Sequence, residues 1–153
     1  MNENASGDDA KLHRRFAAQF FNDTWALIEK PNRSPDDDAR MIHLAHASRM
    51  HWEFVGDAQN KAVGEWQIAR VYSMLKMKEA AVYHARRCLA LIEGAGITGF
   101  FLGSAHEGLA RALRVAGDQS AEKHLAAARK ILSELTDPED KQTLEGDLAS
   151  VPA

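Results

Sequence analysis

The sequence predicts a single all-α domain in which about seven antiparallel helices stack as helical hairpins. Its 153 residues suffice for one domain with one sizeable core. Leu and Ala are abundant and β-branched residues are sparse, which favours helix over strand. Short turn segments separate apolar stretches of helical spacing, and such short connections make neighbouring helices antiparallel. We expect a flexible N-terminal tail at 1–9, the domain at 10–149 and a C-terminal tail at 150–153.

The N-terminal part of the domain predicts two helices. The first covers about residues 10–30, where large apolar and aromatic side chains recur at helical spacing. Pro31 ends it, because proline cannot continue a helix. Residues 34–37, Ser-Pro-Asp-Asp, are a strong restart signal, since serine caps orphan amides and aspartate favours the positive end of the dipole. The second helix is therefore expected to run to about Val55.

The middle of the chain predicts three more helices. Gly56-Asp57 ends the second helix and caps a third at about 58–75, because aspartate is a favoured N-cap residue. A fourth helix follows to Glu93, and a glycine-rich segment connects it to a fifth at about 100–116. These helices have similar lengths and short connections, so each is expected to pack against the next.

Two further helices are predicted at the C-terminal end. Gly117-Asp118 forms a turn, and the sixth helix then carries one apolar stripe that ends near Leu135. Residues 137–140, Asp-Pro-Glu-Asp, open a short seventh helix that runs through Leu148. No segment has the alternating pattern of a β-strand.

Small residues recur at close-packing positions in the two central hairpins. Ile68-Ala69-x-x-Tyr72 is followed by Ala81-x-x-x-Ala85-x-x-Cys88, and Leu109-Ala110-x-x-Leu113 by Ala121-x-x-x-Leu125-x-x-Ala128. These segments resemble the Leu-Gly-x-x-Tyr and Ala-x-x-x-Phe-x-x-Ala patterns of tetratricopeptide repeats. The resemblance covers about residues 64–135 and implies a superhelix of α-α hairpins.

The chain departs from the tetratricopeptide pattern in two ways. The spacing from Ala69 to Ala110 exceeds the usual period of about 34 residues, and the usual proline after the fourth helix is missing. Residues 43–49 and 64–68 also resemble segments of an uncharacterised family of small bacterial proteins, a likeness that implies no activity.

Charge and cysteine content argue against several classes of protein. The 19 Lys and Arg residues are scattered among 22 Asp and Glu residues, so we expect neither a nucleic-acid nor a membrane partner. Cys88 is the single cysteine, which excludes a disulfide framework or a zinc site of cysteines within one chain. The polar, acidic N-terminus lacks the pattern of a secretory signal, and we expect a cytoplasmic protein. We expect no catalytic residue, no metal site and no cofactor.

The repeat resemblance implies a concave groove, where this family binds peptides along the first helix of each hairpin. In this chain the groove positions are Trp66, Arg70, Ser73, Ser104, Glu107, Arg111 and Arg114. Three arginines bind carboxylates well and Trp66 supplies an anchor, so the expected partner is a protein or peptide with acidic or C-terminal carboxylate groups. This makes the chain a non-catalytic binding scaffold. In the alternative, Trp66 belongs to the core and the arginines pair with acidic neighbours.

The histidines offer an alternative function. His43, His46 and His51 of the second helix, with Glu65 and His84, would form a pocket of a small-molecule or metal-binding protein, with an enzymatic role left open. A helical metal site needs ligands from facing helices, and the sequence contains no His-Glu-x-x-His motif. The simpler interpretation is that these histidines form interhelical hydrogen bonds or lie on the surface.

The predicted N-terminal helix is unusually aromatic, with Phe16, Phe20, Phe21 and Trp25. A short array leaves its terminal apolar faces uncapped, so a homodimer is one expectation. The alternative is that this helix folds back as the cap of the array.

Overall fold

The computed structural model describes residues 6–153, which fold into helices joined by short loops. This part of the chain contains seven helices and no strand, which confirms the predicted all-α fold of helical hairpins. None of the described helices is long and apolar enough to span a bilayer. The helices are α1 (Gly7–Ile28), α2 (Pro35–Val55), α3 (Ala58–Met74), α4 (Lys78–Gly94), α5 (Phe100–Ala116), α6 (Ala121–Glu134) and α7 (Pro138–Ala149).

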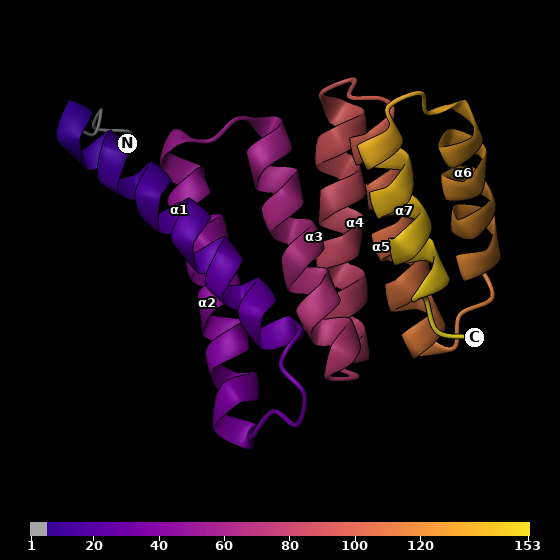
Figure 1. The fold of residues 1–153 in the computed structure, drawn as a ribbon, viewed down its shortest axis with the longest axis horizontal. Helices are drawn as coiled ribbons and strands as arrows, with labels where there is room; N and C mark the ends of the chain where they lie inside the picture. The colour runs from indigo at the N-terminus through magenta and orange to yellow at the C-terminus, as the bar shows by residue number, and fades with distance from the viewer. Residues whose placement is uncertain (1–5) are drawn as a thin grey trace.

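Successive helices pair as the hairpins α1–α2, α3–α4 and α5–α6, which follow one another along the long axis of the molecule (Figure 1). The first helices of neighbouring hairpins also contact each other, α1 with α3 and α3 with α5, and α7 packs against α5 in the same way. The second helices α2, α4 and α6 each pack against the helix that follows them. As a result, α1, α3, α5 and α7 share one face of the molecule, which we call the shared face.

The start of α1 differs from the prediction. The helix begins at Gly7 rather than near residue 10, because Ser6 forms a capping box with Asp9. The Ser6 hydroxyl accepts a hydrogen bond from the Asp9 N–H, and the Asp9 carboxylate accepts one from the Ser6 N–H, both at 3.3 Å. Residues 7–9 of the predicted tail are therefore helical, and its residues 1–5 lie outside the described part of the chain.

The central core is built largely from small side chains where α3, α4, α5 and the start of α6 meet. Ala69, Ala81, Ala85 and Ala112 are all buried there, with Leu109, Leu113 and Ala121 in the same cluster. Alanines let helix backbones approach closely, which is the role expected for them in the two central hairpins. This packing fixes the positions of α3 and α5 on the shared face.

Candidate functional site

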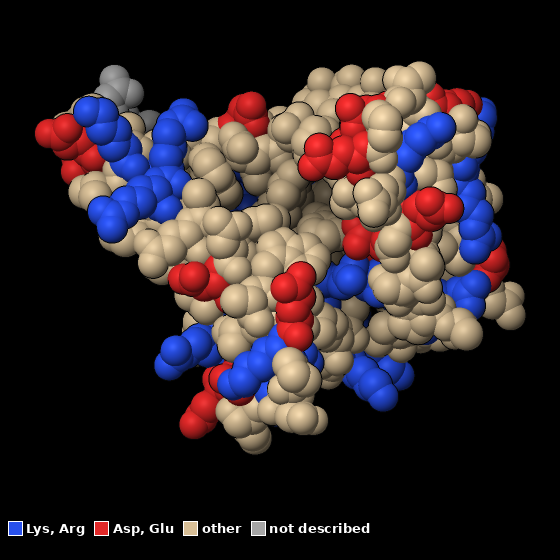
Figure 2. Space-filling model, in the orientation of Figure 1, with Lys and Arg blue, Asp and Glu red and all other residues tan. Residues whose placement is uncertain are grey.

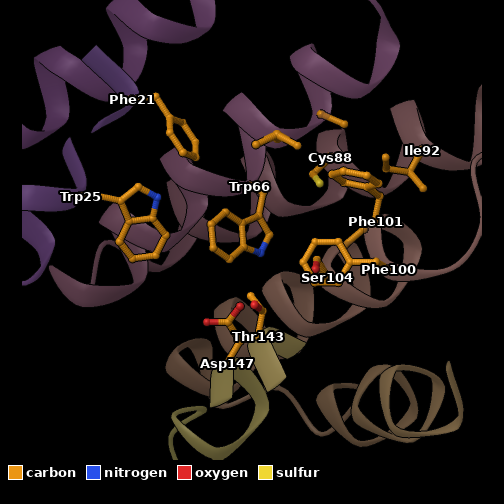
Figure 3. A pocket seen from close by; sticks show the side chains of 13 residues that line it. Phe21, Trp25, Trp66, Cys88, Ile92, Phe100, Phe101, Ser104, Thr143 and Asp147 are labelled. Atoms are coloured by element: carbon orange, nitrogen blue, oxygen red, sulfur yellow. The ribbon is translucent and has the colours of Figure 1, made fainter. Parts of the chain in front are cut away.

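The shared face is hollowed between α1 and α7 (Figure 2) and holds a cavity of about 240 Å³. Its wall is mostly apolar and contains five aromatic rings, so we call it the aromatic cavity (Figure 3). It is lined by Phe21 and Trp25 of α1, Ala62, Val63 and Trp66 of α3, Cys88 and Ile92 of α4, Phe100, Phe101, Ser104 and Ala105 of α5, and Thr143 and Asp147 of α7. Apolar cavities of about 150 Å³ hold a benzene ring, so this one has room for a ring-sized group.

Trp66 is held in the cavity wall by α5. Its indole Nε1 donates a 3.0 Å hydrogen bond to Glu107 Oε2. The ring also lies against Gly108, where an added Cβ would come within 2.7 Å of Trp66 Cδ1. Trp25 stands next to it with a centroid separation of 5.8 Å (Figure 3). These contacts fix the position of the Trp66 ring, and a rigid wall lowers the entropic cost of binding.

A buried network of four charged side chains lies beside the cavity. Glu107 is fully buried, and its Oε1 accepts hydrogen bonds of 2.9 and 2.7 Å from Nε and Nη2 of Arg111. Arg70 Nη1 lies 3.7 Å from Glu107 Oε1 and 3.7 Å from Asp147 Oδ1. Burial raises the pKa of Asp147, and the nearby Glu107 carboxylate raises it further. Two positive and two negative groups thus balance, and Asp147 is the member that reaches the cavity wall.

Arg111 of α5 forms hydrogen bonds that attach α7 to α5. Its guanidinium donates to the backbone carbonyl oxygens of Asp147 at 2.9 Å and of Ser150 at 3.0 Å, and to the Ser150 hydroxyl at 2.7 Å. These acceptors lie at the C-terminal end of α7, where the helix dipole favours a cation. Arg111 therefore positions the helix that brings Asp147 to the cavity.

The residues predicted for a peptide groove are only partly brought together. Trp66 and Ser104 line the aromatic cavity, Arg70 and Glu107 lie in the charge network beside it, and Ser73 is buried. The three arginines do not share an open groove. Arg111 is 6% exposed and bonded to α7, while Arg114 forms an ion pair with Glu122 of α6. The reason is that α7 packs on the part of α5 where the groove would continue.

Only three of the five residues of the alternative histidine pocket lie together. His46, Glu65 and His84 lie together where α2, α3 and α4 meet. His84 Nδ1 is 2.6 Å from Glu65 Oε2, and the rings of His46 and His84 are 5.3 Å apart. His43 is exposed, and His51 instead faces His13 of α1 with an Nδ1–Nδ1 distance of 2.8 Å. The five predicted residues therefore do not line one pocket.

Glu65 is the centre of the α2–α3–α4 cluster. Its Oε1 accepts hydrogen bonds from Arg49 Nε at 3.2 Å and Arg87 Nε at 3.0 Å. Burial alone would raise its pKa, but the hydrogen bonds from His84 and Arg87 outweigh burial and leave the pKa below its usual value. Both oxygens are thus occupied by side chains of the protein. Among residues 6–153, no group of three or more His, Cys, Asp or Glu side chains is placed to hold a metal ion.

A second polar pair joins α5 and α6. His106 and His124 face each other with an Nδ1–Nδ1 distance of 3.0 Å. His106 lies four residues before Ala110, just as Glu65 lies four residues before Ala69. The His106–His124 pair of the α5–α6 hairpin therefore corresponds in position to the Glu65–His84 pair of the α3–α4 hairpin. Burial lowers the pKa of both histidines. This position therefore holds an interhelical polar contact in both hairpins.

The aromatic side chains of α1 point to two places. Phe21 and Trp25 line the cavity, whereas Phe16 and Phe20 stack on each other and lie near His51 of α2. The aromatic side chains of this helix, Phe21 and Trp25 among them, were expected to serve in capping the array or in self-association. The homodimer remains a prediction.

No family model, no curated protein sequence and no solved structure matches this chain. The resemblance to tetratricopeptide repeats therefore remains a prediction from motifs.

Several cavity residues were absent from the predicted site. The aromatic ones are Phe21, Trp25, Phe100 and Phe101, and their signal in the sequence is their clustering near the end of one helix and at the start of another. Asp147 had no such signal. Its place in the site depends on how α7 packs.

Proposed function

We propose that this chain is a non-catalytic binding module whose aromatic cavity accepts a ring-sized, largely apolar side chain of a protein or peptide partner. The observation that carries the proposal is the cavity itself, which is lined by five aromatic residues and located on the shared face. Burying one large apolar side chain contributes about 1.5–3 kcal/mol, which suits an anchor residue.

The chemistry of the cavity favours binding over catalysis. Burial raises the pKa of the Cys88 thiol to about 12, so the thiolate needed for nucleophilic attack is scarce at neutral pH. Ser104 Oγ has no hydrogen-bond partner among the described residues, so no base activates this hydroxyl. The remaining wall is aromatic and aliphatic, and such groups bind rather than react.

The acidic partner expected from the sequence would have to rely on Arg70. Arg111 already donates to Glu107 and to the end of α7, and Arg114 is paired with Glu122. The apolar anchor therefore supports the binding proposal better than a clamp of arginines does.

The test selects peptides from a random displayed library on the full chain and measures synthetic copies by calorimetry. The selected peptides should share one bulky side chain with a large apolar part and bind in a one-to-one ratio. Ser104→Leu should weaken them by about tenfold or more, because leucine fills the cavity. The free energy of unfolding should not fall, since the variant also removes a buried hydroxyl without a partner.

Ser133→Leu is the matched control, because Ser133 is exposed near the end of α6 and does not line the cavity. It should leave the affinity unchanged. Selection of no peptide, or equal affinity of selected peptides for the chain and for Ser104→Leu, would overturn the proposal.

A further inference from the structure

The charged side chain on the wall of the aromatic cavity is the carboxylate of Asp147. It enters from α7, below Trp66 and next to Thr143 in Figure 3, and its side chain is 18% exposed. The arginines of the network do not line the cavity. Asp147 is therefore the charged side chain that a ligand can contact in the cavity wall.

This carboxylate is weakly compensated by the protein. The distance from Asp147 Oδ1 to Arg70 Nη1 is 3.7 Å, longer than a hydrogen bond, and Arg70 is shared at the same distance with Glu107. Arg111 binds the backbone oxygen of Asp147 and gives its side-chain hydrogen bonds to Glu107. Burial raises the pKa of Asp147, and the nearby Glu107 carboxylate raises it further. A cation in the cavity could approach it more closely than Arg70 does.

The rings around the cavity also suit a cation. The guanidinium carbon of Arg70 lies 5.9 Å from the ring centroids of both Trp25 and Trp66, so these two indoles already stabilise one positive charge. Phe21, Phe100 and Phe101 add further π-faces on the cavity side. Ser104 contributes a hydroxyl that has no hydrogen-bond partner in the described chain. Rings with a carboxylate at one end form a site that recognises ammonium groups.

We propose that the group bound in the aromatic cavity carries a protonated amine on its apolar body, with Asp147 as the counter-ion and the aromatic rings around the carbon skeleton. This inference rests on the proposed binding function and specifies its ligand class. Two sources share this chemistry, a lysine side chain of a partner peptide and a free small amine. A partner that presents a carboxylate, as expected from the sequence, is the opposite outcome of the test.

The first experiment compares three probes of similar shape by calorimetry on the full chain: phenethylamine, phenethyl alcohol and phenylacetate. The amine should bind about tenfold more tightly than the alcohol, and phenylacetate should bind most weakly. Asp147→Asn should remove the preference for the amine and leave alcohol binding in place. This variant should fold, because asparagine has nearly the same shape and relieves a half-buried charge.

Glu145→Gln is the matched control, since Glu145 is an exposed carboxylate of the same helix. It should keep the full preference for the amine. The second experiment takes a peptide from the library selection and replaces each lysine with norleucine. If the norleucine peptide binds more weakly than its parent, and Asp147→Asn removes this difference, the amine is a lysine side chain of a peptide. If phenethylamine alone shows the preference and the norleucine peptide keeps its affinity, the amine is a free small ligand.

The outcomes separate the two proposals. If the amine and the alcohol bind equally, and Ser104→Leu abolishes both, the binding function stands and the amine inference falls. Tighter binding of phenylacetate overturns the inference in favour of a carboxylate at Arg70. If no probe binds and the norleucine peptides keep their affinity, the inference is likewise overturned. If neither probes nor peptides bind, the proposed function itself fails.

Discussion

Trp66 on α3 and the fully buried Glu107 on α5 are joined by a 3.0 Å hydrogen bond from the indole Nε1 to Oε2. The bond connects the wall of the aromatic cavity to the charge network. Glu107 also accepts two hydrogen bonds from Arg111, and Arg111 holds the end of α7. The shape of an apolar cavity therefore depends on polar groups that lie outside it.

Replacing Glu107 with alanine should lower the free energy of unfolding by about 3–5 kcal/mol, because Arg111 would remain buried without its carboxylate. Urea denaturation followed by circular dichroism measures the loss. Glu122→Ala, which breaks the exposed pair with Arg114, is the control and should cost less than about 1 kcal/mol. Similar losses in both variants would contradict a structural role for the buried network.

Gly108→Ala should destabilise the fold by about 1–3 kcal/mol, although alanine is the better helix former. The added methyl group would lie 2.7 Å from Trp66 Cδ1 and would displace the indole. Tryptophan fluorescence and urea unfolding report both effects. Gly146→Ala is the matched control on α7, where an added Cβ meets no atom within 4 Å, and it should stabilise by about 0.5–1 kcal/mol. A stable Gly108→Ala with unchanged fluorescence would refute the close contact.

Leu144→Ala should release α7 and cost about 2–5 kcal/mol, because Leu144 is fully buried and packs over Gly103. Hydrogen exchange should show faster exchange of the α7 amides than of those in α3. Leu12→Ala, at a side chain that is 47% exposed, serves as the control and should change stability by less than about 0.5 kcal/mol. Unchanged protection of α7 would contradict its attachment through Leu144.

The fold should lose stability as the pH falls below about 6.5. Burial lowers the pKa of His46, His51, His106 and His124 in the folded state from the ordinary value of 6.5. At a pH between the folded-state pKa and 6.5, the unfolded chain binds more protons than the folded chain. The stability from these neutral histidines is therefore fully present above pH 6.5 and is lost as the pH falls through the folded-state pKa. Each unit of pKa difference contributes about 1.4 kcal/mol.

Urea unfolding at about pH 7.5 and about pH 5.5 tests this dependence. The double variant His106→Gln, His124→Gln should show a smaller drop, because it removes two of the groups whose pKa is lowered by burial in the fold. An undiminished drop in the variant would assign the pH dependence to other groups. Constant stability of the parent chain between the two pH values would refute the prediction.

Cys88 should resist alkylation in the folded protein at neutral pH. It is 3% exposed, and burial raises the pKa of its thiol to about 12. Iodoacetamide should react about a hundredfold more slowly with the native chain than with the chain in urea, as measured by mass spectrometry. Rapid labelling of the native protein would mean that the packing around Cys88 opens in solution.

Local signals predicted most of the fold. Ser34 and Pro35 begin α2 as expected, with a capping box to Asp37, and α5 occupies its predicted range of 100–116. The start of α1 was wrong because Ser6 was not recognised as a cap. Caps, prolines and helical periodicity act over a few residues, so they can be read along the chain.

The candidate site was predicted less completely. The repeat register assigned Trp66 and Ser104 to one peptide-binding groove, and both line the aromatic cavity. It also placed Arg114 there, although this side chain turns to α6 and pairs with Glu122. A register fixes which face of a helix a residue occupies, but the neighbouring side chains decide its partner.

The sequence by itself determined the helices, their order and their antiparallel pairing, because these follow from periodicity, caps and loop length. Only the tertiary structure decided that Trp25, Trp66 and Asp147 surround one cavity. These three residues come from α1, α3 and α7, and no local pattern encodes the distance between them. Those distances result from the packing of alanines between helices and from the hydrogen bonds that Arg111 donates to the end of α7.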